Sequence, residues 1–130
     1  MSRKAVARFA VGSAHLIARL SPHHIRTAMM LLRGGAAPAT YVNTSAARDA
    51  VLAVSLACTG PQGCLSRSLA TALLCRMSGQ WPVWCVGVRV LPPFGAHAWV
   101  EAEGRVVDED VPEDYFKRLM AVPALESKRS

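Results

Sequence analysis

Apolar residues recur at three- and four-residue spacing through most of the first 79 positions, which is the period of an amphipathic helix. Ser21-Pro22 offers a helix N-cap followed by proline at the first helical position, and a glycine pair closes the segment that follows. Thr44 or Ser45 offers a further N-cap. The four predicted helices cover residues 5–20, 23–33, 46–57 and 64–77, with a connector at 36–42.

The pattern changes after Gly79 to runs rich in valine and tryptophan and to strict alternation, as in AHAWVEA. Glu103-Gly104 is a turn signal between two of these runs. Three strands are predicted at 82–90, 96–102 and 105–108, followed by a short terminal helix at 112–120 and a loosely held tail. Helices followed by strands indicate an α+β domain with a small antiparallel sheet.

Composition and charge narrow the class of protein. The chain has 130 residues, 52% of them hydrophobic and 18% charged, which is typical of one folded domain. Residues 1–100 hold ten Lys/Arg and a single acid, Asp49, whereas residues 101–130 hold five Lys/Arg and eight acids. Such a basic body fits nucleic acid, a membrane surface or an acidic peptide. The basic residues are scattered singly with no aromatic platform between them, so we expect no nucleic-acid partner.

The N-terminal segment and the cysteines indicate the compartment. Arg8, His15 and Arg19 interrupt the first apolar stretch, and a secretory signal tolerates such charges poorly, so we expect a cytoplasmic protein. The four cysteines form no C-x-x-C pair, which favours ordinary thiols over a zinc site. Neither a GxxxxGK[ST] nor an HExxH motif is present, so we expect chemistry that needs no ATP, metal or other cofactor.

Cys64 is the cysteine placed for chemistry. It follows Gly60-Pro61-Gln62-Gly63 and opens the predicted helix at 64–77. The helix macrodipole and the unpaired N–H groups of a first turn favour a thiolate at that position. The same N–H groups can bind an oxyanion that develops on a substrate carbonyl. A single cysteine is most simply a small buried hydrophobe, so the assignment needs a partner base.

His97 is the histidine best placed to be that base. It lies on a predicted strand between two alanines, which leave room for the imidazole to face a second element, and Trp99 could form a wall of the site. His15, His23 and His24 lie on or beside predicted helices and are most simply polar surface residues. A helix-start cysteine with a strand histidine fits the nucleophile–base couple of a thiol enzyme.

The histidine then needs an orienting acid, and the acidic turn after the hairpin offers three. If Glu103-Gly104 is a two-residue turn, Asp110 pairs with His97 and Asp108 is its diagonal neighbour on the same face. If the loop has three residues, the register shifts by one and Glu109 faces His97. The sequence predicts an acidic partner and leaves Asp108, Glu109 and Asp110 open.

Three segments resemble a known family: AVLAVSLACTGPQGC at 50–64, GCLSRSLATALLCR at 63–76 and WCVGVRVLPPFGAHAWVEAEGRVVDE at 84–109. They are similar to the lasso-peptide leader peptidases, which are transglutaminase-like cysteine peptidases. The resemblance covers roughly residues 45–120 and implies a transglutaminase-like, papain-like peptidase core. On this basis we expect a helical segment at 1–43, the peptidase core at 44–120 and the loose tail at 121–130.

The resemblance also implies a function and roles for individual residues. Such enzymes cut a ribosomal precursor between leader and core, beside a leader-binding recognition-element protein and a macrolactam cyclase. Cys64 matches the nucleophile and His97 the general base, while the acid is matched equally by Glu109 and Asp108. Two further residues match recurrent family positions: Gln62, a candidate oxyanion donor, and Arg67, a candidate for substrate binding or for fixing the helix.

Rival interpretations come from other classes of protein. A transglutaminase-like acyltransferase would share the catalytic residues and pass the acyl group to an amine. A non-catalytic basic binding module, or a structural partner with an inert thiol, would leave Cys64 unreactive. The helix at 5–20 either packs on the core, docks the recognition-element protein, or lies on an anionic membrane through its basic face.

Overall fold

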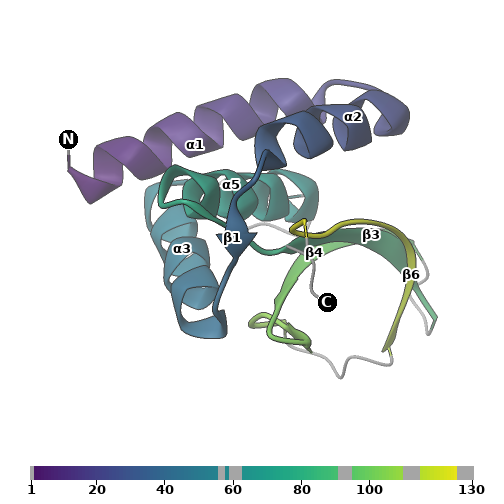
Figure 1. The fold of residues 1–130 in the computed structure, drawn as a ribbon. Helices are drawn as coiled ribbons and strands as arrows, with labels where there is room; N and C mark the ends of the chain where they lie inside the picture. Colours follow the sequence, from purple (N-terminus) through teal and green to yellow (C-terminus); the bar gives the residue numbers. More distant parts are fainter. Residues whose placement is uncertain (1, 56–57, 59–62, 91–94, 110–114, 126–130) are drawn as a thin grey trace.

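The computed structural model describes residues 2–55, 58, 63–90, 95–109 and 115–125, and it sets a layer of helices against a curved sheet (Figure 1). The central helix, α5, contacts α1 and α3 as well as the sheet. Three of the predicted helices lie within two residues of their observed bounds. In the described part of the chain, no helix is long and apolar enough to cross a membrane. The helices are α1 (Arg3–Ala18), α2 (Pro22–Arg33), α3 (Tyr41–Val54) and α5 (Cys64–Met77).

The third helix begins earlier than the sequence predicts. Thr40, rather than Thr44 or Ser45, is its N-cap, and the Thr40 hydroxyl accepts a hydrogen bond of 3.1 Å from the backbone N–H of Asn43. Thr44 is instead fully buried within the helix, where its hydroxyl donates to the Thr40 carbonyl. Several polar side chains in a row offered equivalent caps, and tertiary packing selected among them.

The main sheet has four antiparallel strands in the order β5-β4-β3-β6. The two central strands, β3 and β4, match the predicted strands to within one residue, and the third predicted strand is shorter than expected. A separate two-stranded parallel pair, β1 (Ala37–Pro38) and β2 (Gln80–Trp81), ties the predicted connector to the end of α5. The strands of the main sheet are β3 (Val83–Arg89), β4 (Ala96–Ala102), β5 (Arg105–Val106) and β6 (Phe116–Val122).

The predicted terminal helix at 112–120 is wrong for the described residues 116–120, which belong to β6. β6 pairs with β3 through a register shift at Val86/Gly87. A Cβ at Gly87 would lie 2.1 Å from the carbonyl oxygen of Lys117, so only glycine permits this close approach. Pairing continues to Val122, which is 1% exposed, so these residues form a strand because β3 offers them a partner edge.

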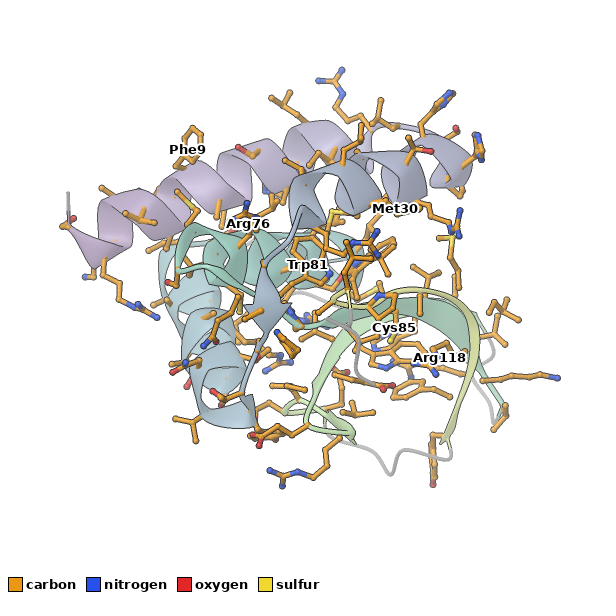
Figure 2. The ribbon with its side chains drawn as sticks, viewed as in Figure 1. Phe9, Met30, Arg76, Trp81, Cys85 and Arg118 are labelled. Atoms are coloured by element: carbon orange, nitrogen blue, oxygen red, sulfur yellow. The ribbon has the colours of Figure 1, made fainter. Side chains whose placement is uncertain are left out.

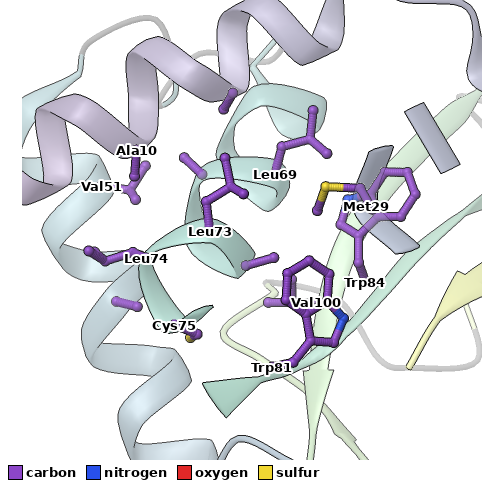
Figure 3. Close-up of a cluster of buried hydrophobic side chains, with 14 of the residues drawn as sticks. Ala10, Met29, Val51, Leu69, Leu73, Leu74, Cys75, Trp81, Trp84 and Val100 are labelled. Carbon is purple, nitrogen blue, oxygen red and sulfur yellow. The ribbon is translucent and has the colours of Figure 1, made fainter. Parts of the chain in front are cut away.

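The core lies between α5 and the sheet, with α1 covering the other side of α5 (Figure 3). Ala7, Ala10 and Ala14 of α1 are almost completely buried, and their small size allows the two helices to approach closely. All three buried indoles are satisfied: Trp84 Nε1 donates to Ser68 Oγ at 3.1 Å, Trp81 Nε1 to the Val122 carbonyl at 2.9 Å and Trp99 Nε1 to Glu101 Oε2 at 2.9 Å. This packing fixes the start of α5 over the edge of β4. The fold is α+β with its helices at the N-terminal end, as predicted.

Candidate active site at the start of the central helix

Cys64 is the first residue of α5. Gly63 occupies the N-cap position and provides no side-chain hydrogen bond, so the N–H groups of the first turn are not capped by a side chain. Cys64 is partly exposed, whereas the other three cysteines are buried. A partly exposed thiol at the positive end of a helix is a reactive position. Gln62, the candidate oxyanion donor, lies outside the described residues.

His97 lies on β4 and is 6% exposed. Its imidazole is stacked on the ring of Phe116, with centroids 4.6 Å apart, and faces Trp99 at 5.8 Å. Trp99 and Phe116 are also stacked on each other at 4.9 Å. These rings hold the imidazole plane in one orientation, so Trp99 does form a wall beside His97, and Phe116 of β6 forms a closer one.

Glu109 lies within hydrogen-bond distance of His97, with 2.9 Å between Glu109 Oε1 and His97 Nε2. The carboxylate is also 3.5 Å from Arg48 of α3, and both side chains of this ion pair are largely buried. Because Nε2 faces Glu109, Nδ1 is the ring nitrogen left for the hydrogen bond between His97 and the Cys64 thiol. The structure therefore brings Cys64, His97 and Glu109 together in a line of hydrogen bonds.

The route by which Glu109 reaches His97 differs from both registers considered from the sequence. Glu103 and Gly104 have φ of 54° and 76°, and the ladder pairs Glu101 with Val106, which is the two-residue turn. Continued pairing in that register would place Asp110 opposite His97. The chain instead leaves the ladder at Asp108, whose φ is 54°, and that left-handed residue directs the next side chain, Glu109, to the histidine.

Asp108 is occupied elsewhere. Its carboxylate accepts hydrogen bonds from the hydroxyl groups of Ser45 and Tyr41 on α3, and its backbone N–H donates to the Tyr41 hydroxyl at 3.2 Å. A further contact, 2.7 Å from the Tyr41 backbone N–H to Glu103 Oε1, fastens the hairpin to the same helix. Asp108 thus holds the turn that presents Glu109 and does not contact His97; Asp110 lies outside the described residues.

The start of α5 reaches β4 at the edge of β4 that faces β5. The N–H of Val107 donates to the carbonyl of Val100 at 3.0 Å, so the Val100 backbone faces β5, and strand alternation directs the Ala98 backbone to the same edge. Among the residues that the structure describes, no strand pairs with that edge beyond Val107. The start of α5 takes this place, and the Ala98 backbone forms a hydrogen bond with the Cys64 thiol. The departure at Asp108 therefore makes room for Cys64.

The electrostatics of the three groups favour an ion pair. The hydrogen bond from His97 lowers the pKa of Cys64 against the opposing effect of burial. Burial alone would lower the pKa of His97, but its hydrogen bonds and charge interactions with Cys64 and Glu109 raise that pKa to about 9. Burial would raise the pKa of Glu109, whereas His97 and Arg48 lower it. Between the two shifted values the thiolate and the imidazolium coexist.

Two arginines lie near the site: Arg67 was a candidate from the sequence, and Arg48 was not. Arg67 donates a hydrogen bond of 2.9 Å to the Cys58 carbonyl, and its charge lowers the pKa values of Cys64 and Glu109. It therefore holds the Cys58 backbone and adds positive potential near the thiolate. Arg48 could not be found from the sequence, because it lies on a different helix, far along the chain from the acid it contacts.

The other three cysteines are buried, and two of the other histidines make contacts away from the site. Burial raises the pKa of Cys75 to about 11 and that of Cys85 to about 12. His24 pairs with Ser21 at the start of α2, and His15 contacts Ser66. In the part of the chain that the structure describes, no group of three His, Cys, Asp or Glu side chains is arranged to hold a metal ion.

The geometry fits acyl transfer through a thiol. A thiolate, an imidazole within reach of it, an acid behind the imidazole and free helix N–H groups are the parts that this reaction needs. The family model described as "Transglutaminase-like superfamily" matches residues 7–121, a span that runs from α1 to β6. No curated protein and no solved structure matched the chain.

Proposed function

The chain belongs to the transglutaminase-like superfamily, and from that premise we propose that it is a cysteine peptidase that removes the leader from a ribosomally made lasso-peptide precursor. The observation that carries the peptidase proposal is the line of contacts from Cys64 through His97 to Glu109. The choice of a lasso-peptide precursor rests on the sequence motifs around Cys64 and His97. A reduced thiol is required, which fits the cytoplasm.

The proposed reaction begins with Cys64 Sγ attacking the scissile carbonyl carbon, with the thiol proton held on His97 Nδ1. The carbonyl oxygen gains the negative charge and is stabilised by the N–H groups at the start of α5. The C–N bond breaks as His97 donates its proton to the leaving amine, which becomes the N-terminus of the core peptide. The leader remains bound to Cys64 as a thioester.

Water completes the proposed reaction. His97 accepts a proton from the water while the oxygen attacks the thioester carbon, and the C–S bond breaks to release the leader as a free acid. Glu109 accepts the Nε2–H hydrogen bond throughout and stabilises the imidazolium each time it forms. His97, and to a smaller extent Arg48, lower the pKa of Glu109 against the effect of burial, so the acid stays ionised, orients the ring and does not take the proton.

We further propose that a leader-binding recognition-element protein docks on the exposed face of α1 and α5. Phe9 and Leu16 are 64% and 66% exposed and line an apolar groove there, with Phe9 projecting outward (Figure 2). Arg76 is part of the same groove, and the first 48 residues contain no acid. Apolar and basic side chains together fit a partner that presents apolar and acidic residues. The lasso cyclase would act on the product in the same assembly.

The docking proposal is tested by the double variant Phe9→Ser/Leu16→Ser. Because both side chains are exposed, the variant should fold and its Cys64 should keep its reactivity toward iodoacetamide. Cleavage stimulated by the partner should fall about tenfold, because two apolar contacts are lost. Unchanged stimulation would contradict docking at this face, and loss of binding to anionic vesicles instead would assign the face to a membrane.

The peptidase proposal is tested by mass spectrometry of the products. The precursor and its partner proteins are to be taken from the reading frames that neighbour this one. Wild-type protein should release the leader as a free acid, and Cys64→Ala should release none. Leader joined to an added amine would indicate the acyltransferase, and full cleavage by Cys64→Ala would contradict a thiol mechanism.

A further inference from the structure

An apolar cavity of about 210 Å³ adjoins Cys64 and His97. It lies where α2, the start of α5 and the helix-facing side of the sheet meet. A concave apolar space beside a few polar, reactive groups is the usual form of a binding site in proteins. Its walls are formed mainly by Pro22, Ile25, Leu65, Trp84, Val86 and Met120.

The chemistry of these walls is uniform. Among the described residues that line the cavity, only Cys64 and His97 carry reactive polar atoms, and both already belong to the candidate active site; the Trp84 indole N–H is bonded to Ser68. Neither charged nor amide side chains occur among these described lining residues. A polar group placed here would lose its water contacts without gaining a partner, whereas an apolar group would be buried favourably.

The cavity is accessible from the side on which substrate must approach. Cys64 is partly exposed and Pro22 is exposed, so the space is open at the thiol and at the start of α2. Ile25, by contrast, is 4% exposed and forms a buried part of the lining. α2 is therefore a wall of the site as well as part of the helical layer, so residues 1–43 contribute to the site itself.

We propose that this cavity is the subsite for an apolar side chain of the substrate, adjacent to the scissile bond. An apolar cavity of about 150 Å³ is already large enough to hold a benzene ring, so side chains of the size of Leu, Met or Phe fit the space. The substrate class is then a peptide with such a residue next to the bond that is cut. The peptide part of this statement rests on the proposed function; the affinity of the cavity for apolar groups does not.

The test uses alkylation of Cys64, which needs no peptide cleavage. Two neutral reagents, iodoacetamide and N-benzyl-iodoacetamide, are compared by their rates with the protein and with free cysteine. Binding of the benzyl group in the cavity should make the benzyl reagent about tenfold faster relative to iodoacetamide than it is with free cysteine. The same ratio for protein and free cysteine would overturn the proposal.

Matched variants place the effect in the cavity. Met120→Lys puts a charge in the wall and Val86→Phe fills the space, so each should bring the rate ratio to within about twofold of that for free cysteine. Leu119→Lys is the control, because Leu119 neighbours Met120 on β6, is 66% exposed and does not line the cavity. The iodoacetamide rate reports for each variant whether the site is folded. A control variant that lost the ratio as fully as Met120→Lys would contradict the assignment.

The two proposals fail separately in this design. If the apolar reagent is favoured but no precursor is cut, the cavity stands as an apolar subsite and the leader peptidase assignment is wrong. If the precursor is cut but the rate ratio equals that of free cysteine, the peptidase stands and the subsite is wrong. Where the precursor is cut, Asp at the residue that occupies the cavity should lower kcat/KM by about tenfold or more, and tolerance of Asp at every position beside the scissile bond would overturn the subsite.

Discussion

Cys64 and Cys75 lie on the same helix, about 16 Å apart, and their surroundings give them opposite chemistry. At the start of α5, the hydrogen bond with His97 lowers the pKa of Cys64 despite partial burial. Near the other end, burial raises the pKa of Cys75 to about 11. The residue type and the helix are the same, so the difference comes from the position of each cysteine along the helix and from the groups that other elements place beside it.

The two ends also divide stability from reactivity. Residues 68–75 of α5 are all buried and fill the space between α1, α3 and the sheet. The first turn instead meets the edge of β4 where no described strand pairs with it, a hydrogen-bonded histidine and an open apolar cavity. The buried part of α5 thus fixes the position of its first turn, where Cys64 lies. Substitutions at the two ends should therefore affect stability and reactivity separately.

The largest expected effect follows from exchanging each cysteine for alanine. Cys64→Ala removes the nucleophile and should lower the rate of leader cleavage by at least about a thousandfold. Cys75→Ala should leave the cleavage rate within about twofold of wild type, because its thiol is distant from the site. Cleavage is measured as the initial rate of leader release.

The stability of the two variants should show the reverse order. Cys75→Ala leaves a small void in the core and should lower the free energy of unfolding by about 1 kcal/mol. Cys64→Ala should change it by less than about 0.5 kcal/mol, since the thiol is partly exposed. Urea unfolding measures both, and equal destabilisation by the two substitutions would contradict the division between the ends of α5.

The next effect separates two neighbouring acids. Glu109→Gln removes the charge that stabilises the His97 imidazolium and should lower kcat by about a hundredfold or more. Asp108→Asn weakens the clamp to Ser45 and Tyr41 and only loosens the position of Glu109, so kcat should fall less than about tenfold. Steady-state kinetics of leader release compare them. A larger loss in Asp108→Asn would transfer the orienting role to that residue.

A smaller effect is expected from pH. The imidazolium of His97 is present below its pKa of about 9, and the thiolate of Cys64 is present above its lowered pKa. Cleavage should therefore follow a bell-shaped profile that falls on the alkaline side near pH 9. Cys64 and Glu109 both raise the His97 pKa, and in Glu109→Gln the contribution of the Glu109 charge is lost, so the alkaline limb should move to lower pH. An unmoved limb would show that another group titrates there.

The smallest effect concerns the attachment of the hairpin to α3. Ser45→Ala deletes a hydrogen bond to the Asp108 carboxylate and should cost about 1 kcal/mol of unfolding free energy, since the group is only partly buried. Thermal unfolding measures this loss. Val42→Ala is a suitable comparison, because Val42 is 74% exposed on the same helix and should change stability little.

Much of this fold could be predicted from local patterns in the sequence. Helix α5 and strands β3 and β4 could be predicted nearly to the residue, because their apolar periods, their glycine and proline boundaries and the turn at Glu103-Gly104 are all local signals. The candidate nucleophile and base follow from the same signals, since a helix start and a small-residue strand are visible in sequence. These predictions needed no knowledge of which elements meet.

The remainder depended on contacts between distant segments. The geometry singles out Glu109 over Asp108 because Ser45 and Tyr41, more than sixty residues earlier, hold Asp108 in a left-handed turn. The strand β6 likewise forms because β3 offers an edge with Gly87 opposite Arg118. Neither the turn nor that edge leaves a local signal in the acidic run or in FKRLMAV.

The central claim is that Cys64 and His97 form a thiolate–imidazolium pair, and the pH dependence of alkylation tests it most directly. The rate constant for iodoacetamide with Cys64 is measured from pH 5 to 10 in wild type and in His97→Ala, with the modified residue identified by peptide mapping. We predict that the pKa of the wild-type thiol lies below its ordinary value of 9.0 and that His97→Ala returns it toward that value. A wild-type titration near 9, unchanged by His97→Ala, would contradict it.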